Sequence, residues 1–162
     1  MIGCVDVDYR PAGVTAACVG FDAWGDAVAR VEVVVRAFEP PAPYVPGAFY
    51  ERELPHLRAV LARMPALEVV LVDAYVWLGA DHPGLGWHLH EAIGAPVIGV
   101  AKTRYAGAGA LEVLRGDSAR PLYVTAVGVD PAEAAERVRT MHGEHRIPTL
   151  IRRTDGLARG HA

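Results

Sequence analysis

Cysteine is scarce in this chain of 162 residues, and its two copies, Cys4 and Cys18, both lie in apolar runs. A thiol in such surroundings is more often a small buried side chain than half of a disulfide, and no thiol-based zinc site is visible. Long apolar runs are also lacking, since none reaches the length of about 18 residues that a membrane-spanning helix needs. The N-terminus lacks the basic start and cleavage pattern of a signal peptide. We therefore expect a cytoplasmic protein without membrane contacts.

Positive charge is not in excess either, because the formal net charge is −3. No basic footprint indicates general nucleic-acid binding, so such a function has to rest on local features. Arginines gather only in the C-terminal third, at Arg137, Arg139, Arg146, Arg152, Arg153 and Arg159. A solvated helix face and an arginine-rich tail explain this cluster equally well.

The length and composition fit one globular domain over residues 1–162, which we expect to be a monomer. Apolar, β-branched runs at residues 1–10, 14–23 and 27–38 predict three strands, and their short connections predict an antiparallel meander. The next segment, EPPAPYVPG, holds four prolines and cannot be a helix. Apolar residues at helical spacing then predict an amphipathic helix over residues 48–63.

Strands and helices alternate in the rest of the chain. We expect a strand over 69–73, a helix over 87–93, a strand over 95–101, a hairpin over 111–128 with its turn at 116–118, and a helix from Asp130 to about Met141. A strand, helix and strand in that order imply a parallel crossover. The predicted fold class is therefore α/β, with a mixed sheet of an antiparallel three-strand meander plus parallel strands, flanked by helices.

Two aspartates lie in the first predicted strand, which reads MIGCVDVDYR. Asp6 and Asp8 share a face of that strand, because strand side chains alternate. A buried carboxylate costs several kcal/mol unless it is paired or binds a metal, so these acids lie either on a solvated face or in a site. A third acid, Asp73, ends the fourth predicted strand, and sites in such sheets lie at the carboxyl ends of parallel strands. If that strand lies parallel beside the first, Asp6 and Asp73 meet.

Two carboxylates held close together repel, and they are relieved by sharing a proton or by binding a cation. Ligands that are all oxygen suit Mg²⁺ or Mn²⁺. Such ions bridge phosphate oxygens and stabilise in-line displacement, so paired strand aspartates are a common basis for metal-dependent phosphodiester hydrolysis. The acids alone do not distinguish this chemistry from ordinary polar strand ends.

The proline-rich segment offers a second local feature, because Pro43 and Pro46 flank an aromatic residue, Tyr44. Prolines stiffen the backbone, and a rigid exposed aromatic is suited to wedging between stacked bases. The alternative is a loop that packs Tyr44 on its own core.

Six segments together resemble the endonuclease V family, in order and nearly in spacing, over about residues 2–155. They read VDVDY, PYVPGAFYERE, LVDA, PVIGVAKTR, PLYVTAVG and HRIPTLIRRTD. The most specific matches are the wedge that runs to Arg-Glu and the Ile-Gly-Val-Ala-Lys segment.

The resemblance implies a ribonuclease-H-like fold and assigns roles to individual residues. Asp6 and Asp73 would ligate Mg²⁺, or Mn²⁺ in its place, and Glu53 would complete the acidic site. Lys102 would lie near the scissile phosphate, although a lysine whose stem packs at a strand end is the plainer reading. Tyr44 would be the wedge beside a displaced base, with Pro43, Pro46 and Gly47 shaping its loop. His88 would contact the substrate or be a structural histidine.

Family members cut the second phosphodiester 3′ to deoxyinosine in DNA, and some act on inosine in RNA. The resemblance therefore implies DNA or RNA containing inosine as the substrate. Asp8 stands where the family usually has a small polar residue.

This chain departs from the family pattern at two histidines that lie near the metal and phosphate in the family. Gly79 takes the place of one in a gapless alignment, and His82 could replace it only if the loop shifts by three residues. Val129 takes the place of the other. Trp77 and Trp87, in place of small residues, could narrow the pocket.

Three readings follow. The first is a metal-dependent endonuclease that acts on a deaminated base. The second is a catalytically weak or inactive member that binds nucleic acid, which the missing histidines favour. The third keeps only the fold, with the acids as ordinary polar residues.

Overall fold

A seven-stranded mixed sheet forms the centre of the protein in a computed structural model, which describes residues 1–38, 43 and 49–161. The strands of this sheet are β1 (Ile2–Arg10), β2 (Gly13–Phe21), β3 (Val31–Ala37), β4 (Val69–Val72), β7 (Val97–Ala101), β8 (Leu111–Val113) and β9 (Leu122–Val127). A separate hairpin consists of β5 (Trp77–Gly79) and β6 (His82–Pro83). The helices are α1 (Phe49–Leu61), α2 (Leu85–Ile93), α3 (Pro131–Thr140) and α4 (Thr149–Ala158).

The strand order is β3-β2-β1-β4-β7-β9-β8. Strands β1, β2 and β3 pair antiparallel, whereas β4 and β7 run parallel to β1. Strand β9 pairs antiparallel with both β7 and β8. The predicted meander, parallel crossover and hairpin are therefore confirmed.

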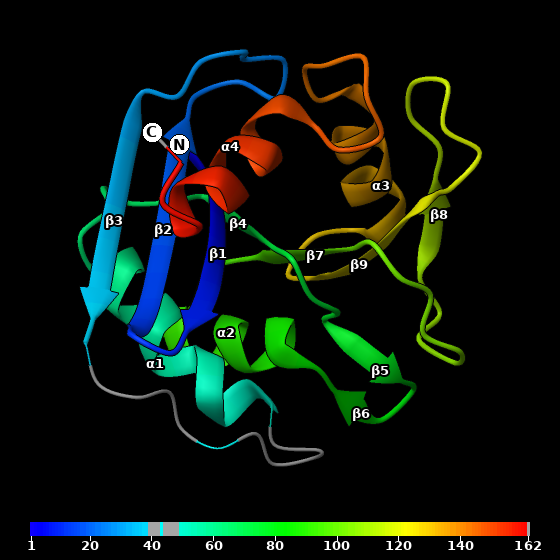
Figure 1. Ribbon diagram of the computed structural model, residues 1–162. Coiled ribbons are helices and arrows are strands. Elements are labelled where there is room, and N and C mark those ends of the chain that lie inside the picture. The colour runs from blue at the N-terminus through cyan, green and yellow to red at the C-terminus, as the bar shows by residue number, and fades with distance from the viewer. Residues whose placement is uncertain (39–42, 44–48, 162) are drawn as a thin grey trace.

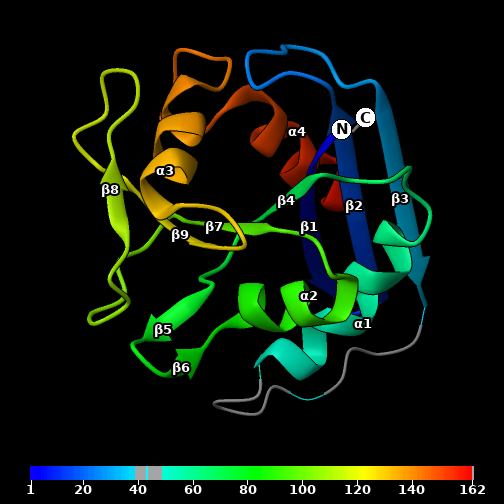
Figure 2. The ribbon, with the colours of Figure 1, turned by 180° about the vertical axis from the view of Figure 1, so that it is seen from behind.

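The helices cover the two faces of the sheet in pairs. Figure 1 shows α4 in front of β1 and β2, and Figure 2 shows α1 and α2 on the opposite face. One core, with Val138 and Leu150, lies beneath α3 and α4, and the other, with Leu57 and Leu89, lies beneath α1 and α2. Burying each such side chain contributes about 1.5–3 kcal/mol, so both faces stabilise the sheet.

The two cysteines are free, as expected, because they lie on opposite faces of adjacent strands. Cys4 packs in the core beneath α3 and α4, whereas Cys18 packs in the core beneath α1 and α2.

Helix α3 begins as its sequence predicts. The Asp130 side chain accepts a hydrogen bond of 3.0 Å from the backbone N–H of Glu133, and proline occupies the first turn. Helix α1 also matches its predicted range, and among the described residues no helix is long and apolar enough to cross a membrane.

Helix α4 and the β5–β6 hairpin were not expected from the sequence. Helix α4 buries Leu150, Thr154 and Ala158 against the sheet. Most of the C-terminal arginines are held within the chain by acids: Arg137 by Glu133, Arg139 by Glu136, Arg153 by Glu32, and Arg159 by Asp155. The arginine cluster is therefore mainly a set of paired side chains on helix faces rather than a free basic tail.

Candidate active site

Strand register brings two of the predicted site residues together. The parallel pairing of β1 with β4 ends at Val5 opposite Val72. The next residues along the chain are Asp6, still within β1, and Asp73, directly after β4, so the two carboxylates lie side by side. Both line one pocket with Lys102 and Asp155.

These side chains share the face of the sheet that α3 and α4 cover. Cys4, Leu71 and Val100 pack in the core on that face. Strand side chains alternate, so the residues two positions further on point the same way. Those residues are Asp6, which lies in β1 just past its pairing with β4, and Asp73 and Lys102, which directly follow β4 and β7.

Asp6 carries its charge at an energetic cost in this position. Burial, and after it the charge of Asp73, raise the pKa of its carboxyl group from 3.8 to about 7. A hydrogen bond of 2.8 Å from the backbone N–H of Val7 and the charge of Lys102 oppose this shift. Their effect is smaller, so the site favours either a proton or a further cation at Asp6.

Lys102 is the cation that the structure supplies to these acids. Its Nζ lies 2.5 Å from Asp73 Oδ2 and 3.9 Å from Asp155 Oδ1. Burial alone would lower the pKa of Lys102, but the hydrogen bond and charge of Asp73 and the charges of Asp155 and Asp6 raise it overall. The ammonium group is therefore held protonated among three carboxylates.

Glu53 approaches the same acids from α1. Burial, and after it the charge of Asp6, raise the pKa of its carboxyl group from 4.5 to about 8. The charge of Arg52 opposes this shift, and its guanidinium stacks 4.0 Å from the ring centre of Tyr9 on β1. The Tyr9 hydroxyl donates a hydrogen bond of 3.2 Å to the Arg52 carbonyl, which ties α1 to the strand that carries Asp6.

Close packing fixes the chain just after Asp73. A Cβ atom at Gly99 would lie 2.3 Å from the carbonyl oxygen of Ala74, so only glycine allows this approach. The buried Thr125 hydroxyl accepts a hydrogen bond of 2.8 Å from the backbone N–H of Val76. The glycine of the PVIGVAK segment thus positions the residues that follow Asp73.

A second, wider pocket of about 400 Å³ opens beside Asp73, and four aromatic side chains contribute to its lining: Phe49, Tyr50, Tyr75 and Tyr105. Tyr75 and Tyr105 form part of its wall, with ring centres 6.0 Å apart. The Tyr75 hydroxyl donates to the carbonyl of Thr103 at 2.8 Å and accepts from the backbone N–H of Tyr105 at 3.0 Å. Tyr75 therefore holds the segment that follows Lys102.

The predicted substrate-binding residues are only partly described. Tyr44, Pro46 and Gly47 lie outside the described residues, and Pro43 is exposed. His88 lies on α2 with its ring stacked on Tyr50 of α1, at 3.6 Å between ring centres. Burial lowers the pKa of His88. The structure therefore does not bring His88 into the acidic pocket, and its ring links two helices.

The two histidine replacements lie in different places. His82 lines the wide pocket with Asp73, whereas Gly79 pairs with His82 across the β5–β6 hairpin. An imidazole from the shifted position therefore lines the same pocket as Asp73. Val129 follows β9 at the other end of the sheet, because Val127 pairs with Val97 at the start of β7. Its side chain is remote from the acids, contrary to expectation.

The tryptophans do not narrow the pocket as the sequence suggested. The rings of Trp77 and Trp87 lie 4.6 Å apart, and Trp77 Nε1 donates a hydrogen bond of 3.3 Å to the carbonyl of Ala126. Neither ring lines the pocket beside Asp73.

Asp155 is a pocket residue that sequence reasoning missed. It lies on α4, its carboxylate forms an ion pair with Arg159 Nε at 3.0 Å, and its charge also raises the pKa of Asp6. The spacing of Leu150, Ile151 and Leu157 after Pro148 was a signal for this helix. Predicting the helix would have made Asp155 a candidate site residue.

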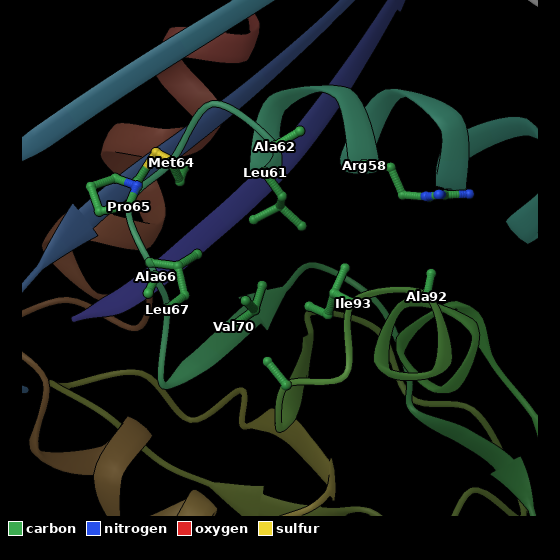
Figure 3. A pocket seen from close by; sticks show the side chains of 11 residues that line it. Arg58, Leu61, Ala62, Met64, Pro65, Ala66, Leu67, Val70, Ala92 and Ile93 are labelled. Atoms are coloured by element: carbon green, nitrogen blue, oxygen red, sulfur yellow. The ribbon is translucent and has the colours of Figure 1, made fainter.

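A further pocket of about 400 Å³ lies at the C-terminal ends of α1 and α2, and Figure 3 shows its lining. Its walls are mainly aliphatic, with Leu61, Leu67 and Ile93 facing the opening and Arg58 at one side. None of the acids lines it, so the candidate active site is the acidic pocket and the aromatic pocket beside it.

Residues 1–128 match the family model described as endonuclease V. The chain belongs to the endonuclease V family. The endonuclease V of Rhodospirillum centenum is 36% identical over 91% of this chain and 71% of its own length. That of Streptomyces avermitilis is 35% identical over 96% of this chain and 77% of its own length.

Solved endonuclease V structures share the fold, which is ribonuclease-H-like as expected. The crystal structure of the Streptomyces avermitilis endonuclease V has a TM-score of 0.79 and 30% identity, covering 98% of this chain and 79% of that chain. The catalytic domain of human endonuclease V has a TM-score of 0.79 and 26% identity, covering 99% and 81%.

The acids of this endonuclease V relative form a donor set that is all carboxylate. Two members, Asp6 and Glu53, are partly buried and repel each other. Such donors fit a hard divalent cation. Within the described ranges, however, no three His, Cys, Asp or Glu side chains are grouped so as to hold a metal ion. A cation would therefore be held by two carboxylates and water rather than by a closed protein cage.

Proposed function

We propose that this chain is a divalent-metal-dependent endonuclease that hydrolyses a phosphodiester 3′ to a deaminated base, with deoxyinosine in DNA as the substrate and inosine in RNA as a second one. The observation that carries the proposal is the register of β1 and β4, which sets Asp6 beside Asp73 with Lys102 against them. Membership of the endonuclease V family suggests that this arrangement hydrolyses a phosphodiester bond.

Asp6 and Asp73 are the residues that would hold the cation. The raised pKa of Asp6 supports this assignment, because an added cation would offset the repulsion that raises it. Two carboxylates leave room for the waters that Mg²⁺ retains, and Mn²⁺ accepts the same ligands. A bound Mg²⁺ supplies charge neutralisation at the phosphate and a more acidic water.

Glu53 and Lys102 would then act on the substrate itself. A general base works best when its pKa lies near the working pH, and the pKa of Glu53 is about 8. We assign it to accept the proton of the attacking water. Lys102 carries three N–H donors and would bind an oxygen of the scissile phosphate, released from Asp73 once a cation neutralises that carboxylate.

The aromatic pocket beside Asp73 would receive the displaced base. Tyr105 lines this pocket and is 51% exposed, so its ring presents stacking surface to a base. Stacking of a base on an aromatic ring contributes about 1–3 kcal/mol. In this proposal Tyr44 is the wedge on a loop shaped by Pro43, Pro46 and Gly47, and His88 supports the pocket through Tyr50.

A relative of the same fold supports a nucleic-acid substrate. The endonuclease V of Ciona intestinalis, with a D234N substitution, is solved in complex with a 23mer DNA containing an inosine followed by a ribo-adenosine. That chain is 18% identical to this one, with a TM-score of 0.78, so it supports the fold and suggests the ligand class to test.

The test is a cleavage assay with Mg²⁺ or Mn²⁺ on labelled DNA and RNA that carry one inosine each. The proposal expects a nick at the second phosphodiester 3′ to inosine, lost in Asp73→Asn. Asp22→Asn is the matched control, since Asp22 is an exposed acid that pairs with Arg30 outside the site. Equal cleavage by both variants would contradict the proposal.

The alternative is a member that binds inosine-containing nucleic acid without cutting it. The contact of Lys102 with Asp73 favours this reading, because it neutralises one proposed ligand already. No nick in the assay above, together with inosine-dependent binding of the same oligonucleotides, would decide for it.

A further inference from the structure

The two edges of the main sheet are built differently. Strand β8 forms one edge with only three residues. Strand β3 forms the other with seven, Val31–Ala37, in an unbroken register with β2 and without proline. Figure 1 and Figure 2 both show β3 at the outside of the sheet. A long, regular, apolar edge strand offers unpaired N–H and C=O groups to another strand.

Opposite charges lie symmetrically along this edge. Glu32 and Arg36 stand two residues before and two residues after Val34, on the same face of the sheet as Val34. Glu32 accepts from Arg153 of α4 at 2.8 and 2.9 Å. The Arg36 guanidinium, by contrast, has no ionic partner in the part of the chain that the structure describes.

We propose that β3 pairs antiparallel with β3 of a second copy of this chain, about a two-fold axis at Val34. That register sets Glu32 of each copy opposite Arg36 of the other, and Val33 opposite Val35. Edge strands usually avoid pairing by carrying charges that repel. Here the same charges attract in the symmetric register, and an opposite-charge cross-strand pair stabilises an antiparallel sheet.

Exposed apolar side chains gather at the same edge. Val28 is 78% exposed, Val34 is 37% exposed and Phe38 is 83% exposed. Phe38 directly follows β3, and in the proposed register it lies opposite Arg30 of the other copy. An open pocket of about 480 Å³ between Val34, Arg36 and the end of α4, near Leu157, leaves room on this face for the second copy's side chains.

One strand pair buries less surface than a permanent dimer needs, so the dimer is reversible and concentration-dependent rather than obligate. The proposed dimer differs from the monomer that the sequence led us to expect. The inference does not depend on the proposed nuclease activity, because the acids lie on β1 and β4, separated from β3 by β2.

Charge reversal tests this pairing by sedimentation equilibrium of the full chain over a range of concentrations. In the dimer, Arg36→Glu places a carboxylate opposite the Glu32 carboxylate in each of the two cross-strand pairs. Glu32→Arg likewise places a guanidinium group opposite the Arg36 guanidinium in each pair. Each variant alone should dimerise about 10- to 30-fold more weakly than the wild type. An equimolar mixture should recover dimerisation, because both cross-strand pairs are then again of opposite charge.

The mixture distinguishes pairing through β3 from dimerisation through a different surface of the protein, which the two substitutions would not affect. Circular dichroism should confirm that both variants fold, since exposed ion pairs such as Glu32 with Arg153 contribute little to stability. Three results would overturn the proposal: a wild type that stays monomeric at all concentrations, single variants that dimerise as well as the wild type, or a mixture that remains monomeric.

Discussion

Acidic residues line a pocket at both ends of the central strands, yet the two ends differ in how their charge is balanced. At the end away from the site, Asp22, Glu68 and Glu133 line one open pocket, and each is paired with a cation. Those partners are Arg30, the N-terminal amino group of Met1, and Arg137.

At the site end, burial and mutual repulsion raise the pKa values of Asp6 and Glu53, whereas the Lys102 ammonium group pairs with Asp73 and Asp155. Four acids line the far pocket, including the helix cap Asp130, so the number of acids does not distinguish the ends. What distinguishes the site is a pair of partly buried carboxyl groups, Asp6 and Glu53, whose pKa values burial and mutual repulsion raise. Such perturbed groups are a feature of functional sites.

The largest effect should come from neutralising Asp6, one of the two acids at the site whose pKa is raised. Asp6→Asn is expected to lower inosine-dependent cleavage at least about 100-fold, because it removes a proposed cation ligand. The same change should raise the melting temperature in EDTA at pH 8 by roughly 2–4 °C or more, because a repelled buried carboxylate is removed. Cleavage assays and calorimetry on one preparation would check both.

Asp22→Asn is the control in the pocket away from the site, where Asp22, Glu68 and Glu133 each have a cationic partner. It should leave cleavage unchanged and should not raise the melting temperature. If Asp6→Asn and Asp22→Asn behaved alike in both measurements, the contrast between the two ends would have no functional meaning.

An intermediate effect should appear in the pH dependence of stability without metal. The pKa values of Asp6 and Glu53 are about 7 and 8 in the folded protein, against 3.8 and 4.5 ordinarily. Between roughly pH 4 and pH 8 the folded state therefore binds more protons than the unfolded state, so stability falls as pH rises. The melting temperature in EDTA should be higher at pH 5 than at pH 8.5.

Glu53→Gln should flatten this decline, because one of the two titrating groups is removed. Mg²⁺ added at pH 8.5 should restore part of the lost stability to the wild type by binding the folded state. A decline of the same size in the wild type and in Glu53→Gln would show that other groups cause it.

The smallest effect concerns the aromatic pocket. Tyr75→Phe removes the hydroxyl that bonds Thr103 and Tyr105, and a hydrogen bond of this kind contributes about 1 kcal/mol. We expect KM for the inosine substrate to rise about fivefold, with kcat changed less, since the acids remain in place.

Tyr50→Phe is the matched control in the same pocket wall. Its hydroxyl donates an exposed hydrogen bond of 3.3 Å to Glu51, whereas its ring keeps the stack on His88. An equal rise in KM for both variants would argue against a specific role for the Tyr75 hydroxyl.

Sequence patterns predicted the core of the fold because each pattern had a local physical cause. Continuous apolar runs marked β4 and β7, and the Asp130-Pro131 pair marked the start of α3. The parallel crossover from β4 to β7 followed from chain order. The pairing of β1 with β4, and with it the meeting of Asp6 and Asp73, was only a condition at the level of sequence, and the structure fulfils it.

The misses have physical causes too. Helix α4 was hidden by its arginines, which looked like a tail until the acids that pair with them, such as Glu32 on β3, were placed. The position of Val129 could not be read from spacing, because it depends on β9 running antiparallel to β7. Whether His82 faces Asp73 likewise depends on the β5–β6 hairpin, which local propensity does not predict.

The end of the β1–β4 pairing at Val5 and Val72 also bears on how this chain can change during evolution. One residue inserted in β1 before Asp6 would turn that side chain to the opposite face of the sheet. The same holds for β4 before Asp73. Insertions and deletions are therefore confined to the connections between strands, while the stretches from Ile2 to Asp6 and from Val69 to Asp73 must keep their length.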